Sequence, residues 1–224
     1  MTICIAIGLI VMTCSVSRAA AKHTIDNPCG RRALADKHHT MLPLELYVRM
    51  TIGASRNLVD KCRTAMKAYG NQGLLEKDEV NMLDSPHSHV MGLEHRHRIV
   101  STYPDLDQQL RQDYRDISTL FVYLQHAMNQ QLAYDGNTMK TEFNDVKNAF
   151  LGVLCQLDSM LRQRETTVSH FVDSSVMPDL LKNIRSTKHR SFRDYLVLKD
   201  ATLFLDSMID DYEDILAQVL QEQN

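Results

Sequence analysis

Apolar residues recur at helical spacing in four long stretches of the chain. In the first stretch they include Leu44, Val48 and Ile52, each four residues after the last. Positions three or four residues apart share one face of a helix, so each stretch predicts a helix with one apolar face. Four such helices can bury their apolar faces in a common core. The predicted helices span 42–69, 104–132, 138–162 and 191–220.

Connections of unequal length separate these helices. Asp135-Gly136-Asn137 leaves room only for a tight turn between the second helix and the third, so these two must be antiparallel neighbours. The other two connections have about 30 residues each, and extended chain covers about 3.3 Å per residue, so each can return along a whole helix. A long connection, then a short one, then a second long one is typical of a long-chain four-helix bundle with up-up-down-down topology. Pro43, Thr138 and Ser191 are the residues expected at helix starts.

The N-terminus has the pattern of a secretory signal. Residues 3–16 are almost wholly apolar, a run too short to span a bilayer as a helix. Small residues follow, and either Ser17-Arg18-Ala19 or Ala19-Ala20-Ala21 provides a cleavage site. A membrane anchor and a buried first helix are the alternatives. We predict a signal peptide over 1–21 and a secreted, extracellular domain over 22–224, monomeric and without membrane insertion.

Removal of the signal peptide leaves three cysteines, and an odd number in an oxidising compartment indicates one disulfide and one free thiol. Cys155 lies two residues from the core positions Val153 and Leu157, about 200° around the helix, so it points away from the core. Cys62 lies on an apolar face. We predict a Cys29–Cys155 disulfide with Cys62 free; the alternative is that Cys62 pairs with one of the other two.

Several segments resemble cytokines of the interleukin-6 family. Residues 148–157 (NAFLGVLCQL) and 168–173 (VSHFVD) are similar to helix C of leukaemia inhibitory factor and the segment after it, and 27–29 (NPC) to its early Pro-Cys, whose cysteine bridges to helix C. Residues 110–131 resemble helix B of ciliary neurotrophic factor, and 195–216 resemble helix D of cardiotrophin and cardiotrophin-like cytokine. The chain is identified as a member of the leukaemia inhibitory factor and ciliary neurotrophic factor branch.

The resemblance implies a secreted cytokine that assembles cell-surface receptors and triggers JAK-STAT signalling. One surface, on the outer faces of the first and third helices, would bind a glycoprotein 130-like receptor. A second, at the start of the fourth helix, would bind a leukaemia inhibitory factor receptor-like chain through Phe192, Arg193 and Tyr195. Helix phase selects the following candidates for the first surface: Arg49, Arg56, Asn57, Lys67, Lys140, Asn144, Lys147 and Gln156.

These candidate residues have alternative interpretations. The charged ones can form an ordinary solvated face, and Phe192 can serve as a hydrophobic staple rather than an anchor for a partner. The sequence also departs from the family pattern. The branch usually has Phe-x-x-Lys at the start of helix D, whereas here Tyr195 stands three positions after Phe192, and Asp158 replaces a second cysteine expected near Cys155.

Composition and motifs exclude several other classes. The formal net charge is only −3, so no global field favours nucleic acid. No phosphate-binding loop or hydrolase motif occurs, so we expect no enzyme activity and no cofactor. His87, His89, His95 and His97 have metal-ligand spacing but lack cysteines or paired acids to complete a site, so no metal is expected. The rival functions are a secreted carrier of lipid or another apolar ligand and a hormone of the growth hormone type.

Overall fold

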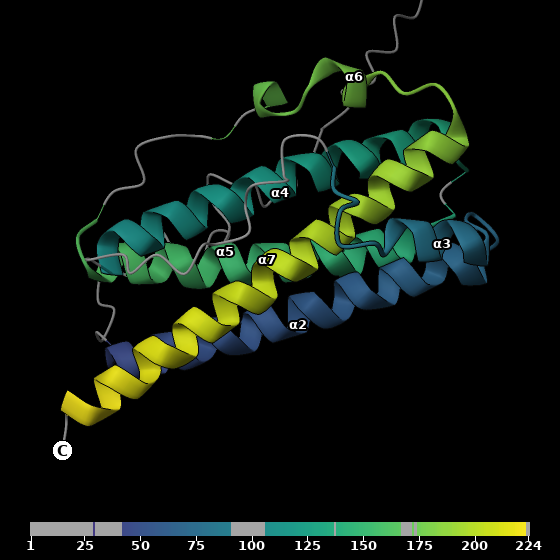
Figure 1. The fold of residues 1–224 in the computed structure, drawn as a ribbon. Helices are drawn as coiled ribbons and strands as arrows, with labels where there is room; N and C mark the ends of the chain where they lie inside the picture. The colour runs from purple at the N-terminus through teal and green to yellow at the C-terminus, as the bar shows by residue number, and fades with distance from the viewer. Residues whose placement is uncertain are drawn as a thin grey trace, which may run out of the picture.

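The structure is a computed structural model that describes Cys29 and residues 42–90, 106–136, 138–166, 172 and 174–222. All regular structure within these ranges is helical. Four long helices lie lengthwise beside one another (Figure 1): α2 (Leu44–Asn71), α4 (Leu106–Tyr134), α5 (Lys140–Gln163) and α7 (Thr187–Glu222). The predicted all-α helical bundle is confirmed. The predicted signal peptide, 1–21, lies outside the described ranges.

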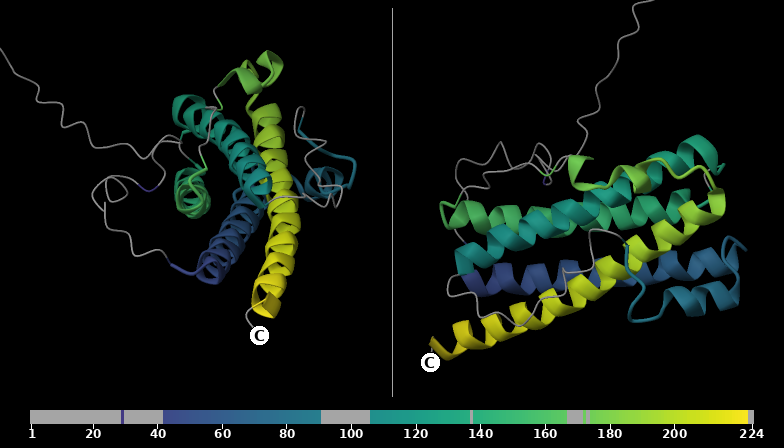
Figure 2. Two further views of the ribbon diagram at one scale, coloured as in Figure 1. Left: turned by 90° about the vertical axis from the view of Figure 1, so that its left-hand side faces the viewer. Right: turned by 45° about the horizontal axis from the view of Figure 1, so that its top comes forward.

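Each long helix has two neighbours in the bundle. Both α2 and α4 contact α5 and α7, and in the end-on view of Figure 2 α5 and α7 lie on opposite sides with α2 and α4 between them. Three short elements lie in the connections: α3 (Lys77–Leu83), the 3-10 helix η1 (Ser174–Val176) and α6 (Asp179–Lys182). They are too short to produce a periodic apolar pattern, and the sequence did not predict them.

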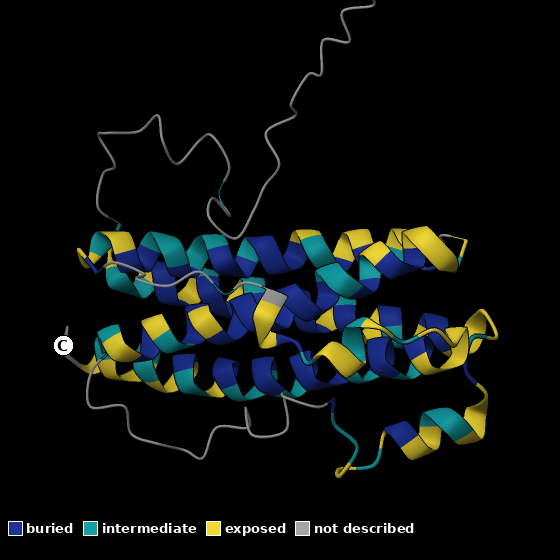
Figure 3. Ribbon diagram, turned by 90° about the horizontal axis from the view of Figure 1, so that it is seen from above, coloured by how far each residue is buried: buried dark blue, intermediate teal, exposed yellow. Residues whose placement is uncertain are grey.

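The core lies along the axis of the bundle, where the inner faces of the four helices are buried and the outer faces are exposed (Figure 3). Phe121 of α4 and Phe150 of α5 are fully buried, with ring centroids 5.8 Å apart. Leu58 of α2 and Leu205 of α7 are also fully buried and contribute to the same core from the other two helices. Each such side chain stabilises the fold by about 1.5–3 kcal/mol through burial, so packing holds the bundle together.

The helix ends differ from the predicted ones by a few residues. α2 begins and ends two residues later than predicted, with Pro43 as its N-cap. The start predicted for the second helix, at 104, lies outside the described ranges, and α4 ends at Tyr134. Thr138 was wrongly predicted as a cap: its hydroxyl donates to the carbonyl of Asp135 at 3.0 Å, and α5 follows Met139 as N-cap. Gly136 adopts φ +66° and makes the tight turn between α4 and α5.

α7 begins four residues before its predicted start. The hydroxyl of Ser186 accepts a hydrogen bond from the backbone N–H of His189 at 3.4 Å, and the Ser186 carbonyl accepts from Arg190 N–H at 3.0 Å. Ser186 therefore serves as the cap. The prediction that Ser191 is the cap is wrong, because Ser191 lies inside the helix and is buried.

Candidate functional site

A hollow of about 250 Å³ lies on the outer surface where α2 and α5 meet. The residues that line it, called the α2–α5 face below, are Ala54, Asn57 and Lys61 of α2 and Asp145, Asn148, Ala149 and Gly152 of α5. The hollow exists because three of these residues are Ala or Gly, whose side chains leave the space between the helices unfilled. A Cβ added at Gly152 would meet no other atom within 4 Å. A protruding side chain of a partner can therefore enter here.

Polar groups border the hollow and can orient a partner. Lys61 and Asp145 form an ion pair across it, with Nζ and Oδ2 3.0 Å apart and the two side chains 40% and 50% exposed. Asn57 and Asn148 are exposed and offer amide donors and acceptors. A small apolar floor with a polar rim is the usual anatomy of a protein-binding patch.

The structure divides the candidates predicted for the first surface among three places. Asn57 lines the α2–α5 face, and half-buried Gln156 lies one turn after Gly152 on the same side of α5. Arg56 instead pairs with Glu213 of α7, so it borders α7. Lys140 and Asn144 line a separate apolar hollow of about 110 Å³ between α4 and α5.

The remaining candidates for the first surface do not reach the α2–α5 face either. Exposed Arg49 lies seven residues before Arg56, on the same side of α2, and pairs with Glu45 of its own helix. Lys67 is exposed and eleven residues after Arg56, again on that side, and Lys147 is half-buried. Periodicity identified exposed positions for six of the eight candidates, but it could not tell which neighbouring helix each position borders.

The second predicted surface, at the start of α7, is mostly buried. Arg193 and Tyr195 are each 3% exposed, so the expectation that their side chains face a partner is wrong. Phe192 is partly buried against the core, and its ring centroid lies 6.2 Å from that of the exposed His189. A hydrophobic staple joins residues on either side of a helix start, so Phe192, six residues after the Ser186 cap, does not form one.

A buried ion pair holds the start of α7 against the end of α4. The Arg190 guanidinium donates to both carboxylate oxygens of Asp135, with Nε 3.0 Å from Oδ2, and both side chains are 4% exposed. The same guanidinium donates to the carbonyl of Arg185 at 2.6 Å and to the hydroxyl of Thr187 at 2.9 Å. The Asp135 carboxylate raises the pKa of Arg190, which keeps the cation charged at any ordinary pH.

A second buried polar group lies one turn further along α7. Arg193 donates to the carboxylate of Asp194, to the Gln130 side chain at 2.6 Å and to the carbonyl of Leu181 at 2.9 Å. Burial raises the pKa of Asp194, and the neighbouring Arg193 opposes that rise. These bonds explain why Arg193 is buried: it joins α7 to α4 and to the segment around α6.

The end of α3 and the segment after it are hydrogen-bonded to the N-terminal half of α7. Tyr195 Oη donates to Asp84 at 2.7 Å, and Lys199 Nζ donates to the carbonyls of Leu83 and Ser88 at 2.7 and 2.9 Å. Burial is the largest influence on both groups, raising the pKa of Tyr195 and lowering that of Lys199. Sequence reasoning missed this contact, because Lys199 interrupts the apolar pattern of α7 without any signal of its partner.

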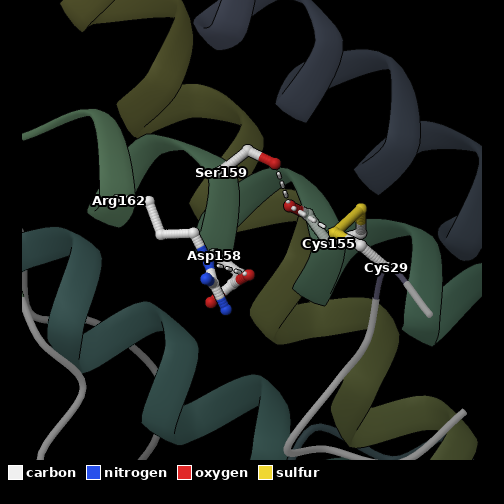
Figure 4. Close-up of a disulfide and its surroundings, with 5 residues drawn as sticks. All are labelled: Cys29, Cys155, Asp158, Ser159 and Arg162. Atoms are coloured by element: carbon white, nitrogen blue, oxygen red, sulfur yellow. Dashed lines mark hydrogen bonds and ion pairs between the residues drawn. A yellow bond between two sulfur atoms is a disulfide. The ribbon is translucent and has the colours of Figure 1, made fainter. Parts of the chain in front are cut away.

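The predicted Cys29–Cys155 disulfide is confirmed, with an S–S distance of 2.02 Å (Figure 4). The Ser159 hydroxyl donates to the Cys155 carbonyl at 2.8 Å, and Asp158 pairs with Arg162 at 2.7 Å. Cys62 is a free thiol in the core, as predicted. Burial raises its pKa to about 12, with the Thr202 side chain opposing the rise through a hydrogen bond.

The histidine cluster considered for a metal is only partly described. Exposed His87 and half-buried His89 lie after α3, whereas His95 and His97 lie outside the described ranges. His89 pairs with Asp200 of α7 at 2.7 Å. Within the part of the chain that the structure covers, no group of three or more ligand side chains lies together. None of the helices described there is long and apolar enough to cross a membrane.

No protein-family model, curated protein or solved structure matches this chain.

Proposed function

We propose that the protein is a secreted cytokine of the leukaemia inhibitory factor and ciliary neurotrophic factor branch of the interleukin-6 family. In this proposal it is not an enzyme: it binds glycoprotein 130-like and leukaemia inhibitory factor receptor-like chains at the cell surface and triggers JAK-STAT signalling. The observation that carries the proposal is the α2–α5 face, an open hollow with a polar rim on the two helices where the resemblance expects a receptor site.

We also propose that the bundle has up-up-down-down topology. Side-chain pairs between neighbouring helices support this topology. As the residue number rises along one helix, the number of the paired residue falls along its neighbour, as it does between antiparallel helices. On this basis α2 and α4 each run antiparallel to α5 and α7. The supporting pairs are Arg56–Glu213 and Arg63–Asp206 between α2 and α7, Lys61–Asp145 and Gln72–Glu142 between α2 and α5, and Asp135–Arg190 and Gln130–Arg193 between α4 and α7.

Two features of the chain support secretion in this proposal. The apolar N-terminal run and its small-residue cleavage site are typical of a signal peptide. The Cys29–Cys155 bond fits an oxidising compartment, where disulfides persist. The extracellular protein acts as a monomer in this proposal.

Receptor assembly requires two separate surfaces on one molecule. The α2–α5 face supplies one. The other is proposed at the start of α7, where Phe192 and the exposed His189 lie together and the Arg190–Asp135 pair fixes the helix. Because α5 and α7 lie on opposite sides of the bundle (Figure 2), two receptor chains can bind without colliding.

Cells that express glycoprotein 130, with or without the leukaemia inhibitory factor receptor, provide the test. Purified protein should raise STAT phosphorylation, and Gly152→Arg should abolish the response by filling the hollow. A Cβ at this position meets no atom within 4 Å, so the larger side chain can start out of the helix without a backbone shift. Ala217→Arg, on the exposed side of α7, is the matched control and should signal like wild type. Absence of any response to the wild-type protein, or equal signalling by the two variants, would contradict the proposal.

A further inference from the structure

A second hollow lies between α4 and α5, close to the turn that joins these helices. Its volume is about 110 Å³, and it shares no lining residue with the α2–α5 face, so the two can be occupied independently. We call it the α4–α5 hollow. Three residues of each helix line it: Met128, Gln131 and Leu132 of α4 and Lys140, Phe143 and Asn144 of α5.

Apolar side chains form much of the α4–α5 hollow. Phe143 is 2% exposed, Met128 packs against the core, and Leu132 is 55% exposed. A partner side chain that covers these residues removes apolar surface from water, which favours binding. The thioether of Met128 and the ring of Phe143 both make favourable contacts with aromatic rings, so the site favours an aromatic side chain. An apolar cavity of about 150 Å³ holds one benzene molecule, so this smaller but open hollow takes a single, partly inserted ring and not a lipid chain.

The surroundings of the α4–α5 hollow are positively charged. Lys140 lines the hollow, and Lys147 follows two helical turns later on the same side of α5, about 10 Å further along its axis. The facing part of α4, residues 117–134, contains no acid. The two acids between the lysines, Glu142 and Asp145, bond with side chains of α2 instead. Neither lysine forms an ion pair within the ranges that the structure describes, so both are available to carboxylates of a partner.

We propose that the α4–α5 hollow is a docking site for an acidic segment of a partner protein, whose aromatic side chain enters the hollow while carboxylates on either side of it bind Lys140 and Lys147. In an extended segment, residues i, i+2 and i+4 lie on one face. Two acids four residues apart, about 13 Å, therefore flank a central ring and come within reach of the two lysine side chains. The site does not depend on the proposed receptor function, because it is argued from the shape and charge of this surface alone.

NMR of the methionine methyl groups in the purified protein measures this site directly, because Met128 lines the hollow. The probe is the end-blocked peptide Asp-Ser-Phe-Ser-Asp, and two matched peptides replace either both acids with Asn or the Phe with Ser. The first peptide should shift the Met128 signal and leave that of Met208, which is buried in the core, unchanged. The Asn peptide should bind roughly tenfold more weakly, because two exposed ion pairs contribute a factor of a few each. The peptide without Phe should cause no shift.

Two variants and a control separate the charge of the site from its apolar surface. Lys140→Glu should remove the preference for the acidic peptide over the Asn peptide. Leu132→Ser should weaken both peptides that contain Phe and keep that preference. Both positions are exposed, so both variants should keep the helical content of wild type by circular dichroism. Lys77→Glu makes the same change of charge on α3, which packs on α7, and should behave like wild type.

Three results of the titration would overturn the proposal: an unmoved Met128 signal at the highest soluble concentration of the acidic peptide, equal affinity for the acidic and Asn peptides, or an unchanged preference in Lys140→Glu. Sodium decanoate tests a lipid as the alternative occupant and should not displace the acidic peptide. Displacement by decanoate would assign the hollow to a lipid and also overturn the proposal. None of these results depends on STAT phosphorylation, so the receptor function is tested separately.

Discussion

Replacing Asp135 with Asn should destabilise the protein more than a typical surface substitution. Asp135 and Arg190 are both 4% exposed and are joined through both carboxylate oxygens. Asn keeps the shape of the side chain but removes its negative charge. Arg190 is then left as a buried cation whose remaining hydrogen-bond acceptors, among them the Arg185 carbonyl and the Thr187 hydroxyl, are uncharged.

The size of the effect follows from this burial. Removing one partner of a buried ion pair costs about 3–5 kcal/mol, because the remaining charge stays desolvated. In a chain of this size each kcal/mol shifts the melting temperature by about 2–4 °C, so the expected loss is roughly 6–20 °C. Asp145→Asn is the matched control, because the Asp145–Lys61 pair is 50% and 40% exposed. An exposed pair contributes only about 0–1 kcal/mol.

Urea and thermal unfolding at pH 7, followed by circular dichroism, measure both variants against wild type. The reasoning predicts a loss of several kcal/mol for Asp135→Asn and little change for Asp145→Asn. A loss below about 1 kcal/mol for Asp135→Asn, or equal losses for the two variants, would show that the buried pair does not hold α7 in place.

Two further predictions concern the cysteines. Cys29→Ser should lower the free energy of unfolding by about 2–4 kcal/mol in urea titrations without changing the helical content, because the bond restrains the unfolded chain; an unchanged midpoint would contradict this. Iodoacetamide should alkylate native Cys62 at pH 8 at least about a thousandfold more slowly than a free thiol, because burial raises its pKa to about 12 and only the thiolate reacts. Mass-spectrometric mapping gives the rate, and fast alkylation of the folded protein would show that Cys62 is accessible.

The helices and the disulfide could be predicted because each depends on local periodicity. Cys155 falls outside the apolar phase of α5 and Cys62 falls within that of α2, which was enough to assign the Cys29–Cys155 pair. The start of α7 was missed because several serines can cap a helix. Only the structure shows that Ser186 accepts the His189 N–H while Ser191 is buried.

The candidate site was harder to predict, because it depends on which helices are neighbours. Arg56 and Asn57 are adjacent in sequence and both exposed, yet Arg56 borders α7 and Asn57 borders α5. Arg193 and Tyr195 were expected at the surface because the resemblance implies a receptor site at the start of the fourth helix, but partners on other elements hold them inside. Ala149 and Gly152, three residues apart on α5, were the available signal for the hollow.

Binding of the purified protein to an immobilised glycoprotein 130 ectodomain tests the central claim most directly. Surface plasmon resonance should detect saturable binding of wild type and of Ala217→Arg, and no binding of Gly152→Arg, because the substitution fills the α2–α5 face. Absence of wild-type binding, or undiminished binding of Gly152→Arg, would contradict the claim that this face recruits a receptor.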